Sequence, residues 1–208
     1  MRVIQKRDYS ELLNLYNNGL PSYKYLQQFD LEVIQSLCIC EGWYVVPTQE
    51  LIQFLRDEIG SSSVIEIGSG NGLVAKRLGI KATDSCFQDK PDVRLYYKTI
   101  GNATVKYGSN VEEIEAVDAV KKYKPHTVLG CWVTQKSKYP SEPQSLYCGV
   151  DEEEILQHCK KYIVVGNRGV HGMKRILSKP HREVKIDGYV SRGSNQDDNV
   201  IYVWDSLV

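Results

Sequence analysis

The sequence predicts an α/β fold: a doubly wound, mostly parallel sheet with a helical preface at the N-terminus and an antiparallel strand pair at the C-terminus. Three observations lead to this prediction. From residue 61 onward short β-branched runs alternate with helical patterns, a glycine-rich turn follows the first of these runs, and residues 1–60 show mainly helical patterns. The 208 residues suit one domain with a substantial core. We therefore expect a single domain over residues 1–208, made of a preface or lid (1–60) and a core (61–208).

The preface contains three helical patterns that glycines separate. Leucines stand among polar residues before Gly19 ends the first pattern, and Gly42 ends the second. Thr48 is placed to cap the third helix, which ends at Gly60. We expect these helices at Tyr9–Tyr16, Leu26–Cys40 and Thr48–Ile59.

The core is expected to contain strands that alternate with helices. The strands are expected at Ser63–Ile67, at Ile80–Thr83, from Val105 onward, at Thr127–Val133 and at Tyr162–Val165. The helices are expected at Leu73–Leu78, Pro91–Ile100, Val111–Tyr123 and Asp151–Lys160. An antiparallel pair is expected at Val184–Val190 and Val200–Trp204, and a long loop at Lys136–Gly149. Sheets of this kind bind ligands outside the carboxyl ends of their strands, so we expect the functional site there.

The most specific local feature is the glycine-rich turn Glu66-Ile-Gly-Ser-Gly-Asn-Gly72. Glycines let a ligand approach the backbone closely, and the start of the following helix offers unpaired amides. These properties suit a nucleoside-bearing cofactor. A dinucleotide-binding turn would need its third glycine at position 73, where this chain has Leu73, and Glu66 would repel a diphosphate.

The turn resembles the first motif of the class I S-adenosylmethionine-dependent methyltransferases, an acidic residue followed by x-Gly-x-Gly-x-Gly. Glu66, Gly68, Gly70 and Gly72 match this motif. The resemblance implies a Rossmann-like fold and S-adenosyl-L-methionine as the cofactor, with the glycine turn against the methionine moiety. The cofactor-binding residues it implies are Glu66, Gly68, Ser69, Gly70, Gly72 and Asp84.

Asp84 is the residue that matches the family's ribose-binding carboxylate at the end of the second strand. A carboxylate can accept both hydrogen bonds that a cis-diol donates, so the match has a physical basis. The interval from Glu66 to Asp84 is short for the family. We therefore expect the helix between them to be shorter than in the family. The adenine contact follows the third strand in the family, and Glu112, Glu113 and Asp118 stay open as alternatives.

Candidate residues for the methyl-transfer chemistry follow the fourth and fifth core strands. The reaction is an in-line displacement at a sulfonium carbon, so the protein mainly aligns the acceptor and, for a weak nucleophile, removes a proton. Trp132 is either a wall of the acceptor pocket or a core residue. Asn167 is a candidate for orienting the acceptor, and His171 is either a general base or a surface histidine.

The leading interpretation is therefore a methyltransferase that acts on a small molecule or a protein. The alternative is a methyltransferase-like protein that binds the cofactor or a partner without catalysing a reaction, and a nicotinamide-dependent oxidoreductase ranks third. Nucleic acid is not favoured, because the net charge is zero. The basic stretch 168–185 is either a local site for a phosphate, a carboxylate or RNA, or a solvated face, as charge runs in neutral proteins usually are. Methylases of base amines carry Asn or Asp, two prolines and an aromatic residue where this chain has Cys131-Trp-Val-Thr134.

The cysteines and the lengths of the apolar runs indicate where the protein is located and whether it binds a metal or a membrane. The six cysteines include no Cys-x-x-Cys pair, so we expect reduced thiols and no metal site. No apolar run is long enough for a signal peptide or a membrane span. We expect a cytoplasmic protein with no membrane partner. The sequence leaves open the acceptor, the need for a base and the oligomeric state.

Overall fold

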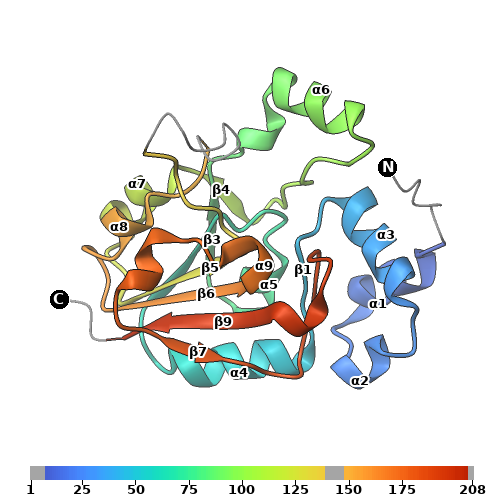
Figure 1. The fold of residues 1–208 in the computed structure, drawn as a ribbon, viewed down its shortest axis with the longest axis horizontal. Helices are drawn as coiled ribbons and strands as arrows, with labels where there is room; N and C mark the ends of the chain where they lie inside the picture. Colours follow the sequence, from blue (N-terminus) through green and yellow to red (C-terminus); the bar gives the residue numbers. More distant parts are fainter. Residues whose placement is uncertain (1–7, 139–147, 206–208) are drawn as a thin grey trace.

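The computed structural model describes residues 8–138 and 148–205 and shows the expected α/β fold (Figure 1). In this part of the chain a seven-stranded sheet has the order β4-β3-β2-β5-β6-β9-β7. All neighbouring strands from β4 to β6 are parallel, and β9 runs antiparallel to both β6 and β7. The strands are β2 (Val64–Ile67), β3 (Lys81–Asp84), β4 (Val111–Glu113), β5 (Thr127–Cys131), β6 (Lys161–Asn167), β7 (Arg182–Val184) and β9 (Asn199–Trp204). The predicted fold class is confirmed.

The chain reverses its direction across the sheet between β2 and β5. From β2 it proceeds to β3 and then β4 at one edge, and it returns to place β5 on the other side of β2. The loops that follow β2 and β5 therefore diverge and leave a crevice at the carboxyl ends of these strands.

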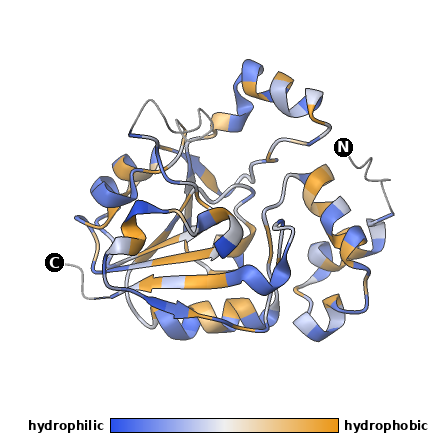
Figure 2. Ribbon diagram, in the orientation of Figure 1, coloured by the Kyte–Doolittle hydropathy of each residue, from blue (hydrophilic) through white to orange (hydrophobic). Residues whose placement is uncertain are grey.

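Helices cover both faces of the sheet. α4 (Gln49–Ile59) and α5 (Leu73–Leu78) pack on one face, and α7 (Ala116–Tyr123) and α8 (Glu152–Ile155) pack on the other. In β6, Tyr162 and Val164 point to the second face while Ile163 and Val165 point to the first, as the period of two in a strand requires. Figure 2 shows the resulting hydrophobic colouring along β6 and β9 and in stripes on α4.

The preface forms a small core of its own. α1 (Ser10–Asn18), α2 (Tyr23–Leu26) and α3 (Leu31–Glu41) bury residues such as Leu12 and Leu37 against each other. The strand β1 (Val45–Val46) then pairs with β8 (Val190–Ser191), which links the preface to the C-terminal part of the chain. Figure 1 shows α1–α3 on the side toward which β6 points, that is, at the carboxyl edge of the parallel strands.

Two of the predicted helices are shorter in the structure. The helix expected at 26–40 is interrupted, because a turn at residues 27–30 separates α2 from α3. The helix expected at 151–160 is wrong beyond Ile155: α8 ends there, and the amides of Lys160 and Lys161 both donate to the carbonyl of His126. These two hydrogen bonds place Lys160 and Lys161 beside His126, where β6 begins, so no further helical turn forms. The remaining helices are α6 (Pro91–Thr99) and α9 (Arg168–His171), with 3₁₀ turns at Phe87–Asp89, Arg175–Ser178 and Gln196–Asp198.

The third core strand and the final strand pair also differ from expectation. Val105 lies in irregular backbone and donates its amide to the side chain of Gln88, whereas β4 forms at Val111–Glu113, which was expected to be helical. The C-terminal antiparallel pair exists, but its first strand is β7, and Val190 pairs instead with Val46. None of the helices within 8–138 and 148–205 is long and apolar enough to cross a membrane.

Candidate functional site

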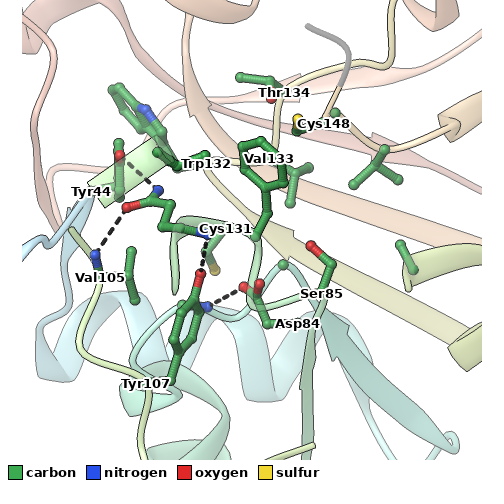
Figure 3. Close-up of a pocket in the computed structure, with 18 of the residues that line it drawn as sticks. Tyr44, Asp84, Ser85, Val105, Tyr107, Cys131, Trp132, Val133, Thr134 and Cys148 are labelled. Carbon is green, nitrogen blue, oxygen red and sulfur yellow. Dashed lines mark hydrogen bonds between the residues drawn. The ribbon is translucent and has the colours of Figure 1, made fainter. Parts of the chain in front are cut away.

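A pocket of about 320 Å³ lies at the carboxyl ends of β2, β3 and β5, where the strand order reverses (Figure 3). Small-molecule sites typically span about 300–1,000 Å³. The glycine turn, the end of β3 and residues 131–134 at the end of β5 line one side of it, and Tyr44, α6 and the segment around Val105 line the other. The pocket therefore occupies the position that the fold predicts for a ligand.

The glycine turn is fixed by close packing at its two ends and open at its middle. Gly68, Gly70 and Gly72 all have left-handed backbones, with φ of 55°, 57° and 70°. A Cβ on Gly68 would lie 2.7 Å from Val133 Cγ1, and one on Gly72 would lie 2.7 Å from Val111 Cγ2. At Gly70 the nearest atom would be 3.6 Å away. Gly70 therefore leaves room beside the pocket that Gly68 and Gly72 do not.

Asp84 ends β3 and joins this turn to the pocket. Its Oδ2 accepts a hydrogen bond from the amide of Gly70 at 2.9 Å (Figure 3). Its Oδ1 accepts one from the amide of Cys86, also at 2.9 Å. Burial raises the pKa of Asp84, and these two amides oppose the rise. An ionised carboxylate has about four acceptor positions, so two stay available for a ligand.

Glu66 and Ser69 are buried and do not line the pocket. Glu66 is fully buried, and its Oε2 accepts from the amide of Ala75 in the first turn of α5 at 2.9 Å. Its Oε1 and the hydroxyl of Ser69 are buried with no hydrogen-bond partner among the described residues. Burial raises the pKa of Glu66 to about 8. As placed here, Glu66 holds the start of α5.

Trp132 forms part of the pocket wall in an unusual backbone conformation. Its φ is 64°, which is rare for a bulky residue, and its amide donates to the carbonyl of Val165 at 2.8 Å. The indole meets the ring of His171 edge to face, with ring centroids 4.9 Å apart. Strain of this kind is concentrated at functional sites, so the pocket-facing position of Trp132 is consistent with a role in ligand binding.

The structure does not bring Asn167 or His171 into the pocket. His171 is 2% exposed, and burial lowers its pKa to about 3, with the charge of Lys174 adding to the effect. The side chain of Asn167 caps α9 through the amide of Gly169 at 3.0 Å and donates to the carbonyl of Asn195 at 2.8 Å. In this arrangement both residues support the pocket wall from behind Trp132.

An aromatic cluster lines the opposite wall of the pocket. The hydroxyls of Tyr44 and Tyr97 lie 3.0 Å apart, and the Gln88 side chain donates to Tyr44 at 3.1 Å. The amide of Gln88 donates to the hydroxyl of Tyr107 at 3.3 Å. These residues come from the preface, from α6 and from the segments beside it. No spacing in the sequence indicates that they meet.

The open alternatives for an adenine contact lie outside the pocket. Glu112 pairs with Lys122 at 2.6 Å, and neither Glu113 nor Asp118 lines the cavity. Glu115 does line it, at the start of α7. Among the residues the structure describes, no group of three or more His, Cys, Asp or Glu side chains could hold a metal ion.

The basic stretch 168–185 is largely neutralised within the fold. Arg168 pairs with Glu183, and the ammonium of Lys174 lies 2.7 Å from the carboxylate of Glu152. Arg182 pairs with Glu58 at 2.7 Å. Arg168 and Arg182 lie on the surface, as expected for a solvated face, whereas Lys174 is buried.

Comparisons with known proteins give structural similarity only. No protein-family model matches the sequence, and no curated protein does. A Thermoplasma acidophilum structure is 18% identical, with 88% of this chain and 95% of that chain covered and a TM-score of 0.38. A Staphylococcus aureus protein described as a proposed caffeoyl-CoA O-methyltransferase is 14% identical, with 94% and 98% covered and a TM-score of 0.40. A Thermotoga maritima SAM-dependent methyltransferase is 11% identical, with 87% and 96% covered and a TM-score of 0.37.

Proposed function

We propose that this chain binds S-adenosyl-L-methionine and transfers its methyl group to a small-molecule or protein acceptor. The observation that carries the proposal is the carboxylate of Asp84, which faces the pocket while it is fixed to the amide of Gly70 in the glycine turn. The motif and the carboxylate thus meet at the one crevice where the strand order predicts a ligand.

The residues of the pocket fit this cofactor. The two free acceptor positions of Asp84 match the two hydroxyls of a ribose. Gly70 leaves space for the methionine part of the cofactor, which is attached to that ribose. The ring face of Trp132 is a suitable neighbour for a sulfonium, because an aromatic face attracts a cation. These contacts would place the transferable methyl group near the end of β5.

S-adenosyl-L-methionine supplies an activated methyl group on a sulfonium, so the protein has to supply alignment more than acid or base chemistry. Trp132 and Val133 would limit the approach of the acceptor to one side. Tyr44, with the preface behind it, would exclude water from the reacting atoms. Among the described residues that line the pocket there is no histidine that could act as a general base. This lining suits an acceptor that is already a good nucleophile and needs no base.

Calorimetric titration with S-adenosyl-L-methionine tests the proposal. We expect Asp84→Asn to raise Kd about tenfold to a hundredfold, because hydrogen bonds to a charged group contribute about 1.5–3 kcal/mol. Asp118→Asn is the matched control, since Asp118 is exposed on α7 outside the pocket, and its Kd should equal that of the wild type. An unchanged Kd in Asp84→Asn would refute the ribose assignment.

The same titration separates the proposal from its alternative. If folded wild-type protein fails to bind the cofactor, the chain is a methyltransferase-like scaffold and an interaction role is favoured. If it binds the cofactor but transfers no methyl group to broad panels of small molecules and peptides, it is a cofactor-binding protein without this activity.

A further inference from the structure

Arg192 lies beside the aromatic wall of the pocket and has an unpaired charge. Its amide donates to the carbonyl of Tyr44 at 2.9 Å, and its guanidinium carbon lies 5.0 Å from the centre of the Tyr44 ring. Its Nη1 is buried, and among the described residues nothing accepts a hydrogen bond from it. No carboxylate within 8–138 and 148–205 forms an ion pair with this side chain.

An unpaired guanidinium of this kind requires an explanation. A buried donor without a partner is unfavourable, so such a group calls for a partner such as a water, an ion or a ligand. Arg94 lies 2.5 Å from Asp89 and Arg182 lies 2.8 Å from Asp205, whereas Arg77 donates to backbone carbonyls and also has a buried nitrogen, Nε, with no partner among the described residues. Arg192 differs from Arg77 because its guanidinium stacks on a tyrosine that lines the pocket.

The pocket wall connects Arg192 to two hydroxyl groups. The ring of Tyr44 lies against the guanidinium, and the hydroxyl of Tyr44 lies 3.0 Å from that of Tyr97. The charge of Arg192 also reaches Tyr97, where it opposes the rise in the pKa of Tyr97 that burial causes. Both tyrosines line the pocket, and the guanidinium of Arg192 lies behind Tyr44. Because one hydroxyl of the pair donates to the other, the pair has one hydroxyl proton left for a ligand.

The two sides of the pocket differ in charge. Asp84 and Glu115 supply carboxylates at the ends of β3 and at the start of α7, and Figure 3 shows Tyr44 set apart from Asp84 and Ser85. Ribose hydroxyls suit the acidic side, whereas a guanidinium with neighbouring hydroxyls suits an oxyanion, to which arginine donates two parallel hydrogen bonds.

We propose that Arg192, Tyr44 and Tyr97 form an oxyanion subsite that binds a carboxylate or phosphate group of the methyl acceptor. This inference rests on the proposed function, and it names the acceptor as an organic anion. The ring of Tyr44 packs against the apolar body of that anion, and a modest shift of the Tyr44 side chain exposes Nη1 to the charged group. The acceptor then lies across the pocket from the ribose position.

Binding of small anions to the protein without cofactor tests the subsite. Benzoate and phenyl phosphate are the probes, benzamide is the neutral analogue, and nuclear magnetic resonance chemical shifts give each Kd. We expect at least one anion to bind the wild type about tenfold more tightly than benzamide does. Arg192→Gln should weaken that anion about tenfold to a hundredfold and leave benzamide unchanged. The stronger of the two anions identifies carboxylate or phosphate as the preferred group.

Two further variants keep this test decisive. Arg94→Gln removes an equal charge from α6 outside the cluster and should leave the affinity for the anion unchanged. If Arg192→Gln does not fold, Arg192→Lys keeps the charge but loses the paired donors, and it should bind the anion several-fold more weakly than wild type. Equal affinity of anion and benzamide, or undiminished anion binding in the folded Arg192 variants, would overturn the proposal.

The test is independent of the cofactor test at Asp84. Arg192→Gln should retain wild-type affinity for S-adenosyl-L-methionine, so failure at one residue does not produce failure at the other. Anion binding is finally repeated in saturating S-adenosylhomocysteine, which carries a carboxylate of its own. If this compound displaces the anion, Arg192 holds the cofactor and the acceptor assignment is wrong; if the anion still binds, the assignment stands.

Discussion

Replacing Lys174 with methionine is expected to destabilise the fold by about 3–5 kcal/mol, the usual effect of removing one partner from a buried ion pair. The ammonium of Lys174 lies 2.7 Å from both carboxylate oxygens of Glu152 and donates to the carbonyl of Val133 at 2.8 Å. Both charged side chains are 2% exposed. In Lys174→Met, Glu152 keeps the hydroxyl of Tyr162 at 2.9 Å, which does not neutralise its charge.

Equilibrium unfolding in urea, followed by circular dichroism, measures this effect. Adding Glu152→Gln to Lys174→Met should recover stability, so that the double variant loses at least about 1 kcal/mol less than the sum of the single losses. Lys121→Met is the control, because Lys121 pairs with Glu154 at 2.8 Å on the surface, where a pair contributes about 0–1 kcal/mol. A loss in Lys174→Met no larger than that of the control, or additive single losses, would refute the reasoning.

Two further predictions concern the glycine turn. Gly68→Ala should lose about 1–3 kcal/mol more stability in urea unfolding than Gly79→Ala. Both variants place alanine in a left-handed backbone, but only at Gly68 would the new Cβ meet Val133. Equal losses of stability in the two variants would contradict this contact. For Glu66, the folded pKa of about 8 exceeds the ordinary glutamate value of 4.5, so the folded state binds more protons between these values and stability should fall as pH rises through them. The slope is at most about 1.4 kcal/mol per pH unit. Glu66→Gln should lack this decline in urea unfolding across the same pH range, and a wild-type slope no steeper than the variant's would count against a proton on Glu66.

The sequence predicted the elements whose signals are local. The strand before Gly68 is a β-branched run, and Thr48 caps α4 by accepting from the amide of Leu51 at 3.1 Å, as its position indicated. The crevice at the carboxyl ends followed from the alternation of strands and helices alone. These features need no knowledge of distant contacts.

Features that depend on distant partners were not predictable in the same way. β4 is three residues long and contains two glutamates, so its own composition favours a helix, and pairing with β3 makes it a strand. Tyr44 reaches the pocket only because β1 pairs with β8, which lies about 145 positions later in the chain. His171 stands between glycine-flanked polar residues that suggested an exposed loop, yet β6 extends to Asn167 and buries it.

Glu66 and Asp84 show why the environment of an acidic residue, more than its place in a motif, decides its task. A carboxylate that is to hold ribose hydroxyls has to be charged and to face the cavity. Asp84 lines the pocket, and although burial raises its pKa, the amides of Gly70 and Cys86 donate to its oxygens and favour the charged form. Glu66 has one amide partner, no exposure and a pKa near 8, so at neutral pH its protonated form predominates and it serves the start of α5. The two acids therefore have different roles: Glu66 holds the start of α5, and Asp84 presents carboxylate oxygens to the pocket beside the glycine turn.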